Sequence, residues 1–280
     1  MMKIMLCALS DPLQDQGYPR KIKSLLEEQG FEVILADSAL KACQPKERAE
    51  EVNAALEQGD YEWILDISGG DLANEVLPFL DYGSYASSQT YFAGFSDLTC
   101  VVNALYAKTG KEAVLFPIGY QTDMKKTACF LRGEDDSALE IRSYWDELSG
   151  NYWIGGNMRG FLKLAGTPYF PVCEKGTLVL EGYTTSINSF YSMLAHYGQM
   201  GVLEQVDEIL FGRFQNIENQ IGLDGMMDFF SNAMESMGLE DLPWGFAPEF
   251  GHVRNCPPLI IGDSGADEEE EDGQDNDGQE

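Results

Sequence analysis

The chain lacks the features that most simply identify a metal, redox or membrane protein. Its six cysteines are scattered without a Cys-x-x-Cys pair, so neither a zinc site nor a disulfide framework is predicted. Its apolar runs, such as residues 3–9, are far shorter than the roughly 20 residues of a membrane helix. No basic segment with a cleavage site precedes them. We therefore expect a cytoplasmic protein without a metal site.

Basic residues are scarce as well. The chain has 18 Lys and Arg against 47 Asp and Glu, for a net charge of −29. Such a surface repels phosphate backbones and anionic lipid, so we expect neither nucleic acid nor a membrane as a partner. The last residues, 263–280, hold ten acidic side chains and no basic one. This segment is predicted to be a disordered acidic tail, either a plain solvated extension or a contact for a basic partner.

What is present predicts an α/β fold. At 280 residues and 44% hydrophobic, the chain can bury a substantial core. Strand patterns alternate with helix patterns, which is typical of a doubly wound parallel sheet covered by helices. Ligands of such sheets bind beyond the carboxyl ends of the strands. The expected strands cover 3–9, 31–36, 61–67 and 90–95, and the expected helices cover 19–29, 45–57, 73–82 and 97–110.

The pattern loosens after residue 117 and resumes near residue 150 with glycine-marked turns. We therefore predict an N-terminal domain over 1–120, a polar connection over 121–148 that carries a helix, and a second domain over 149–262. No internal repeat is visible.

The stretch "GFSDLT" places Ser96 between an expected strand and an expected helix. A serine hydroxyl needs a base to become a nucleophile at neutral pH, and histidine is the usual base. The chain has only two histidines. The helical spacing around His196 indicates packing or surface, whereas His252 follows a loop rich in proline, glycine and aromatic residues, where catalytic side chains are often placed.

A third residue would have to orient the imidazole. Glu181 ends the apolar strand pattern "TLVL" and precedes a glycine, so it is a candidate, although an ordinary glutamate can also end a strand.

The oxyanion of an acyl transfer needs backbone N–H groups aimed at one point. Gly69 and Gly70 can expose theirs because they have no Cβ, and Asp97 can offer one from the first turn of its helix. A double glycine is also common in plain turns.

Five blocks of the sequence resemble, in order and spacing, the LD-carboxypeptidase family of serine peptidases, which includes the microcin C immunity peptidase. The similarity runs from about residue 3 to residue 262. The blocks are "ISGGDLANEVLPFLDY", "FAGFSDLTCVVNALYAKTG", "WIGGNMRGFLKLAGTPYF", "GTLVLEG" and "FGHVRN".

The resemblance implies an N-terminal parallel α/β domain that carries the serine and a smaller C-terminal α/β domain that supplies the glutamate and the histidine. It implies a Ser-Glu-His triad of Ser96, Glu181 and His252, formed where the two domains meet. It also implies oxyanion donors at Asp97 and the Gly69-Gly70 turn, no metal or organic cofactor, a small peptide substrate and a homodimer. The implied activity is that of a carboxypeptidase that releases a terminal D-amino acid from a cell-wall tetrapeptide.

The glycine turn departs from the family pattern. Where LD-carboxypeptidases often read Arg-Gly-Gly-Tyr-Gly, this chain reads Ser-Gly-Gly-Asp-Leu over residues 68–72, which removes a cation and adds a carboxylate. Two alternatives therefore stay open. One is a hydrolase of peptide-nucleotide antibiotics, as in the microcin C branch. The other, from a different class, is a sensing protein that binds a ligand without turnover.

Overall fold

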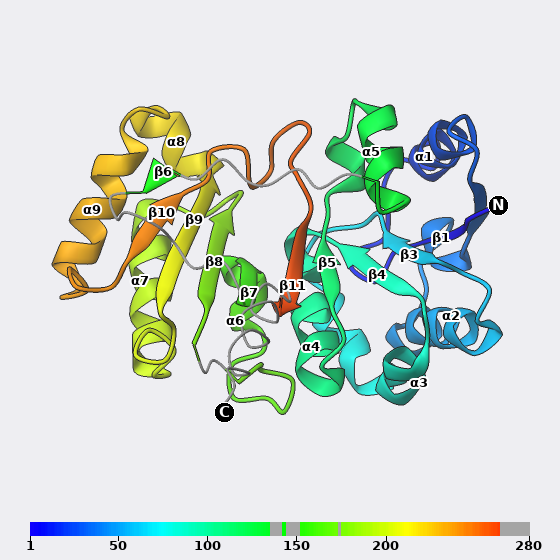
Figure 1. Ribbon diagram of the computed structural model, residues 1–280, viewed down its shortest axis with the longest axis horizontal. Helices are drawn as coiled ribbons and strands as arrows, with labels where there is room; N and C mark the ends of the chain where they lie inside the picture. The colour runs from blue at the N-terminus through cyan, green and yellow to red at the C-terminus, as the bar shows by residue number, and fades with distance from the viewer. Residues whose placement is uncertain (135–141, 144–151, 173–174, 264–280) are drawn as a thin grey trace, which may run out of the picture.

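The computed structural model describes residues 1–134, 142–143, 152–172 and 175–263. Most of the predicted connection after residue 134 and the predicted tail from residue 264 onward lie outside these residues. Figure 1 shows two groups of strands and helices side by side, with the N-terminal half on the right and the C-terminal half on the left.

The N-terminal half is a parallel sheet in the order β2-β1-β3-β4-β5. Strand β2 is added on one side of β1, and β3, β4 and β5 are added on the other. The order of the strands therefore reverses between β1 and β3, which is where doubly wound sheets open a crevice for ligands. The strands are β1 (Lys3–Cys7), β2 (Glu32–Leu35), β3 (Trp63–Asp66), β4 (Tyr91–Gly94) and β5 (Ala113–Leu115). The helices are α1 (Tyr18–Glu27), α2 (Pro45–Gln58), α3 (Tyr82–Ser87), α4 (Thr99–Thr109) and α5 (Met124–Leu131).

Strand β1 shows why the sheet needs helices on both faces. Its side chains alternate between two buried clusters, with Ile4 and Leu6 in one and Met5 and Cys7 in the other. The first cluster is closed by α1 and α5, and the second contains residues of α2, α3 and α4. A strand buried on both faces has no polar side, so its sequence is continuously apolar.

The C-terminal half continues with parallel strands in the order β7-β8-β9-β10, and β6 (Arg142–Ser143) pairs antiparallel with β10. The parallel strands are β7 (Tyr152–Asn157), β8 (Thr177–Gly182), β9 (Glu208–Phe214) and β10 (Trp244–Phe246). The helices are α6 (Met158–Leu162), α7 (Ile187–Gln199), α8 (Gln215–Ile221) and α9 (Met226–Ser236).

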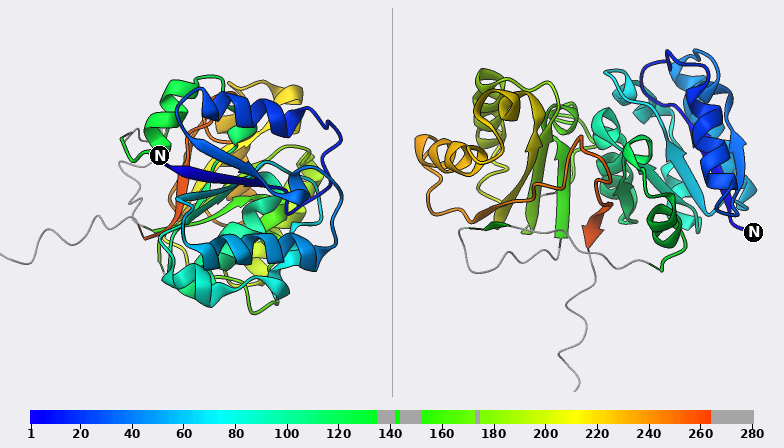
Figure 2. Two further views of the ribbon diagram at one scale, coloured as in Figure 1. Left: turned by 90° about the vertical axis from the view of Figure 1, so that its right-hand side faces the viewer. Right: turned by 90° about the horizontal axis from the view of Figure 1, so that it is seen from above.

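The last described strand joins the two halves. Strand β11 (Leu259–Asp263) pairs antiparallel with β5 through residues 259–261 and with β7 through residues 262–263. The described strands therefore form one 11-stranded sheet, and β11 lies in its middle in both the face and the top views (Figures 1 and 2). The sequence analysis did not predict this strand.

The predicted fold class is confirmed: an N-terminal doubly wound parallel sheet is followed by a second α/β unit. Helix α4 ends at Gly110, in the left-handed conformation, as its sequence predicts. The helix predicted over 73–82 is wrong in type, because the structure has 3-10 helix η2 (Ala73–Phe79) and then begins α3 at Tyr82. The domain boundaries at 120 and 149 stay a prediction. None of the helices in the described part is both long and apolar enough to span a membrane.

Candidate active site

Ser96 lies directly after β4, where the chain turns into 3-10 helix η3 (Ser96–Leu98) and then α4. Its φ is +59°, a left-handed value, and Phe95 before it is fully extended. Few non-glycine residues adopt such a conformation, and those that do are often found at functional sites. The turn therefore presents the serine side chain at the carboxyl edge of the sheet.

Two glycines leave room for this turn. A Cβ on Gly94 would lie 2.7 Å from Leu98 Cβ, and a Cβ on Gly160 of α6 would lie 3.0 Å from the Ser96 carbonyl oxygen. In the usual Gly-x-Ser-x-Gly elbow both small residues belong to one strand-turn-helix segment. Here one of them is supplied by the C-terminal half.

The three residues that the sequence analysis singled out lie together. His252 Nε2 is 3.0 Å from Ser96 Oγ, and His252 Nδ1 is 2.7 Å from Glu181 Oε2. Glu181, on β8, is fully buried, and the His252 side chain is 5% exposed. Ser96 and His252 are 156 residues apart in the chain and belong to different halves, so the packing of the two halves brings the hydroxyl to the imidazole. His196, by contrast, is on the exposed side of α7.

Aromatic rings surround the His252 imidazole. Tyr183 stacks on it with a centroid distance of 4.8 Å, and Tyr120 meets it edge-on at 5.8 Å. Phe95 lies at 5.2 Å on a tilted plane. These contacts restrict the ring to the plane in which its two nitrogens reach Ser96 and Glu181.

A cleft of about 370 Å³ opens beside Ser96 and His252. Its walls are mainly aromatic and aliphatic, and they include Tyr18, Tyr120 and Tyr183. Of the described residues that line it, none is a lysine or an arginine. The cleft therefore offers apolar surface and ring faces to a ligand, and no side-chain cation other than protonated His252.

Asp66 lies at the floor of this cleft, at the end of β3. Burial raises its pKa to about 6, although Ser68 and the backbone N–H of Leu9 donate hydrogen bonds that oppose the rise. Ser68 begins the Ser-Gly-Gly-Asp-Leu stretch over residues 68–72. Its hydroxyl donates to Asp66 Oδ1 at 2.6 Å and accepts from the Ser10 N–H at 3.0 Å, so it fixes the loop.

The predicted oxyanion donors follow the ends of two adjacent strands. Gly69 and Gly70 follow β3, and Asp97 follows Ser96 beyond β4. Within the described residues, the amide N–H groups of Gly70 and Asp97 have no protein acceptor. Gly70 has a φ of +132°, and a Cβ there would come within 2.2 Å of the Asp11 carboxyl carbon, so only glycine fits this turn.

Sequence reasoning missed Asn157, at the end of β7. Its Nδ2 donates to Glu181 Oε1 at 2.8 Å, its Oδ1 accepts from Gly160 N at 3.1 Å, and its backbone N–H donates to Thr99 Oγ1 at 2.9 Å. Asn157 therefore orients the Glu181 carboxylate, which in turn orients the His252 imidazole. It also caps α6. The signal was available, since "WIGGN" ends an apolar strand with a residue that favours helix N-caps.

No group of three or more His, Cys, Asp or Glu side chains in the described parts of the chain is arranged to hold a metal ion. The site places a hydroxyl, an imidazole and a buried carboxylate in sequence, near backbone amides that have no acceptor among the described residues. Such an arrangement can support acyl transfer.

Comparison with known proteins gives matches along most of the chain. Residues 4–115 match the LD-carboxypeptidase N-terminal domain and residues 150–265 match the LD-carboxypeptidase C-terminal domain. The Bacillus subtilis protein named "Putative carboxypeptidase YocD" is 26% identical over 255 residues, which cover 78% of each chain.

Solved structures share the fold. The microcin C7 self-immunity protein MccF, in complex with aspartyl sulfamoyl adenosine, superposes with a TM-score of 0.78 at 19% identity, covering 93% of this chain and 91% of its own. The Escherichia coli MccF sequence is 42% identical over a shorter stretch of 65 residues, 23% of this chain and 19% of its own. A muramoyltetrapeptide carboxypeptidase from Oxalobacter formigenes has a TM-score of 0.74 at 21% identity, with 93% of both chains covered.

Proposed function

The chain belongs to the LD-carboxypeptidase family of serine peptidases, and from that premise we propose that it hydrolyses an amide bond near the C-terminus of a small peptide. The observation that carries the proposal is the continuous contact from Ser96 Oγ through the His252 imidazole to the Glu181 carboxylate, at 3.0 and 2.7 Å. A nucleophile, a base and a buried residue that orients the base are the three parts that such a hydrolysis requires.

In the proposed mechanism His252 Nε2 takes the proton of the Ser96 hydroxyl as Oγ attacks the peptide carbonyl carbon. The amides of Asp97 and Gly70 donate to the oxyanion that forms. His252 then protonates the leaving amine, and a water molecule hydrolyses the acyl-enzyme by the same route. Glu181 accepts from Nδ1–H throughout, so it fixes the tautomer and stabilises the imidazolium. These steps need no metal or organic cofactor.

The first candidate substrate is a cell-wall tetrapeptide, from which the enzyme would release the terminal D-amino acid. The family supports it, as does the fold shared with the muramoyltetrapeptide carboxypeptidase. We also propose that the protein is a cytoplasmic homodimer and that each subunit has the two domains described above. The family resemblance supports this assembly, and sedimentation analysis can test it.

A second candidate is favoured by the cleft itself. Its lining has aromatic rings and no lysine or arginine among the described residues, and such a surface suits a planar neutral group better than a free carboxylate. An aminoacyl or peptidyl nucleotide has such a group on the leaving side of its bond. The ligand in the MccF structure, aspartyl sulfamoyl adenosine, belongs to this chemical class.

The two candidates are separated by incubating the protein with a muramoyl tetrapeptide and, in parallel, with an aminoacyl sulfamoyl adenosine. Release of a free D-amino acid from the first supports the carboxypeptidase, and release of sulfamoyl adenosine from the second supports the nucleotide hydrolase. In both cases Ser96→Ala should abolish release. Tight binding of either compound without turnover would contradict the hydrolase and favour a sensing protein.

A further inference from the structure

We propose that Lys163 is a positioning residue for the oxyanion hole. Its ammonium group lies between the two chain segments that carry the proposed donors, and it bonds to both of them. This inference rests on the hydrolase mechanism proposed above. It gives a role to a residue that is not part of the triad and to which the sequence analysis assigned none.

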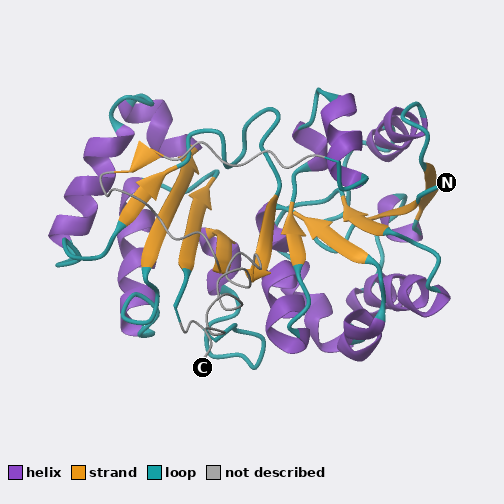
Figure 3. Cartoon of the chain, viewed as in Figure 1, coloured by secondary structure: helices purple, strands orange, loops and turns teal. Residues whose placement is uncertain are grey.

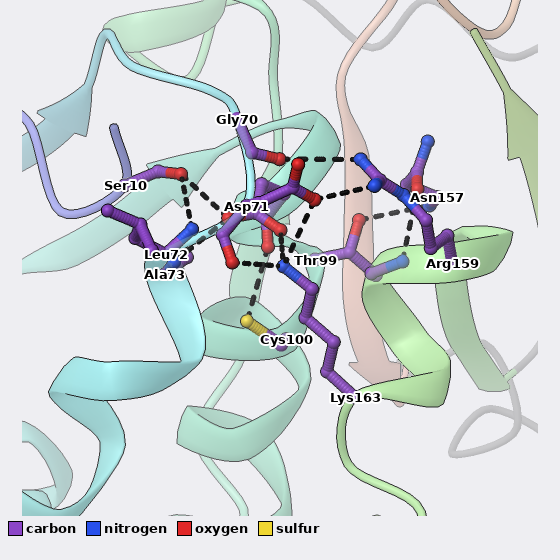
Figure 4. A network of polar contacts seen from close by, with 12 residues as sticks. Ser10, Gly70, Asp71, Leu72, Ala73, Thr99, Cys100, Asn157, Arg159 and Lys163 are labelled. Atoms are coloured by element: carbon purple, nitrogen blue, oxygen red, sulfur yellow. Dashed lines mark hydrogen bonds and ion pairs between the residues drawn. The ribbon is translucent and has the colours of Figure 1, made fainter. Parts of the chain in front are cut away.

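The first of these segments is the glycine turn over residues 69–73. Most of its backbone groups bond to partners outside the turn, whereas the N–H groups of Gly69 and Gly70 have no acceptor among the described residues. Gly69 O accepts from Asp11 N, and Asp71 N donates to the Asp11 carboxylate. Figure 4 shows the others: Gly70 O accepts from Arg159, Asp71 O accepts from Lys163, and Leu72 N donates to Ser10 Oγ. Ala73 N donates to the Asp97 carboxylate.

The second segment is the nucleophile turn, held through the Asp97 carboxylate. That side chain is only 1% exposed. Its Oδ2 accepts from Ser10 Oγ at 2.6 Å and from Ala73 N at 2.8 Å, while its Oδ1 is bonded to Lys163 Nζ. The same residue carries the free amide next to Ser96, so whatever fixes this carboxylate also fixes that N–H.

Lys163 links the two segments. Besides Asp97, its Nζ donates to the Asp71 carbonyl oxygen at 2.7 Å and lies 3.8 Å from the Asp71 carboxylate. Its side chain is 17% exposed, so water screens the contact with Asp97 only weakly. The neighbouring ion pair of Arg159 with Asp71 is different, because both side chains are more than half exposed, and such pairs contribute little.

Lys163 follows α6, in the C-terminal half, whereas both oxyanion segments belong to the N-terminal half (Figure 4). The packing of the two halves therefore places Lys163 beside the oxyanion segments as it places Glu181 and His252 beside Ser96. Backbone donors stabilise an oxyanion only when they are fixed before the reaction. A side chain that fixes them should act on the transition state far more than on substrate binding.

The test measures the kinetics of Lys163→Met, which keeps most of the side chain and removes the charge. Deletion of a single oxyanion donor lowers kcat by roughly a hundred- to a thousandfold in serine proteases. Displacing the donors should lower kcat by a smaller factor than deleting one of them. We therefore expect kcat to fall at least about tenfold, with KM changed less than threefold. Lys163→Arg, which keeps the charge, should recover part of the loss. The reaction of Ser96 with a fluorophosphonate, in which Oγ displaces fluoride from phosphorus, should slow in parallel.

Two further variants separate positioning from stability. Lys111→Met removes another partly buried lysine, one that donates to Ser88 O and Thr90 O far from the site; it should lower the unfolding midpoint and leave kcat unchanged. If Lys163→Met does not fold, Asp97→Asn with Lys163→Met leaves no unpaired buried charge and should fold with the same loss in kcat.

The outcomes are distinguishable. Equal phosphonylation rates and equal kcat in wild type and the folded Lys163 variants would overturn the positioning role and leave the triad intact. A proportional rise in KM with unchanged kcat would also overturn it. Failure of the wild-type protein to react at Ser96 at all would instead overturn the proposed hydrolase, and this inference with it.

Discussion

At the scale of single residues, Ser96 holds a left-handed backbone conformation with a φ of +59°, and the space for it is made by glycines on both sides. Backbone strain of this kind costs about 1–3 kcal/mol and persists only where the surroundings impose it. Gly160 is the clearest part of those surroundings, because a Cβ there would lie 3.0 Å from the Ser96 carbonyl oxygen.

Gly160→Ala should therefore reduce turnover by about tenfold or more, since small displacements of a reacting group are costly, while the protein still folds. Gly198→Ala is the matched control, because the nearest atom to its added Cβ lies at 3.7 Å and it is inside helix α7. It should leave kcat unchanged. Equal kcat values for both variants and the wild type would show that the close contact at Gly160 is not needed.

Asp66 gives a prediction for pH. Burial raises its pKa to about 6 in the folded state, whereas an unfolded aspartate titrates near 4. The folded state therefore holds the proton more tightly, and the associated stability is present below about pH 4 and is lost as pH rises through 6. Relative to Asp66→Asn, the wild-type unfolding free energy should fall by up to about 3 kcal/mol over this window.

Urea unfolding of both proteins between pH 4 and 7 measures this difference. A wild-type stability that rises relative to Asp66→Asn over the same window would contradict the assignment. It would mean that the hydrogen bonds from Ser68 and Leu9 outweigh burial and hold the carboxylate ionised.

Local sequence context made Ser96, Glu181 and His252 candidates, and the resemblance to the LD-carboxypeptidase family joined them into one triad. Sequence reasoning did not reach Lys163 or Asn157, which act through contacts with residues far away in the chain. A lysine just after a five-residue helix looks like any solvated lysine. Only the packing of α6 against the nucleophile turn gives it a partner. The catalytic and oxyanion roles of the predicted residues stay predictions.

At the scale of elements, α6 is short, and its position depends on the contacts of its N-cap residue, Asn157. Asn157 caps it, bonds Glu181 and receives support from Thr99, so the helix and the triad carboxylate share one anchor. The sequence predicted regular structure here without this coupling. It also predicted an ordinary helix at 73–82, but Pro78 lies inside that segment and proline disrupts the α-helical hydrogen bonds, which accounts for the 3-10 geometry.

Asn157→Ser separates the two tasks of this anchor. Serine is a good N-cap, so α6 should keep its cap, but its side chain is too short to reach Glu181. A hydrogen bond to a charged group contributes about 1.5–3 kcal/mol. Without this bond Glu181 is held less firmly as the imidazolium forms, so kcat should fall by roughly tenfold or more.

The control is Ser186→Ala, which removes the N-cap of α7 and should cost about 1 kcal/mol of stability without affecting kcat. Steady-state kinetics and thermal unfolding of the two variants provide the comparison. A loss of stability without any loss of kcat in Asn157→Ser would show that Asn157 serves the helix alone.

At the scale of the whole molecule, β11 makes one sheet out of two. The end of the described chain returns to pair with β5 and β7, and the active site forms across the same junction. The alternation of strands and helices predicted the N-terminal half, and the family resemblance implied the C-terminal one. The alternation could not predict β11, because a short apolar run after Pro257-Pro258 has no periodicity of its own, and its pairing partners are far away in the sequence.

Neighbouring residues of β11 test its role in joining the halves. Ile261 is fully buried, and Ile260, on the opposite side of the strand, is 42% exposed. Ile261→Ala should lower the unfolding free energy by about 2–5 kcal/mol, and Ile260→Ala should lower it by less than about 1 kcal/mol. Activity should be lost at the same urea concentration as β-sheet structure. Activity that disappears much earlier would indicate that the halves separate first.

The most direct test of the account is the site of covalent modification by a fluorophosphonate, located by peptide mass spectrometry. The mechanism predicts a single adduct on Ser96, formed in the wild-type protein and in the Lys111→Met control, and absent from Ser96→Ala. An unmodified Ser96 in folded wild-type protein, or an adduct of equal yield on another residue in Ser96→Ala, would contradict it.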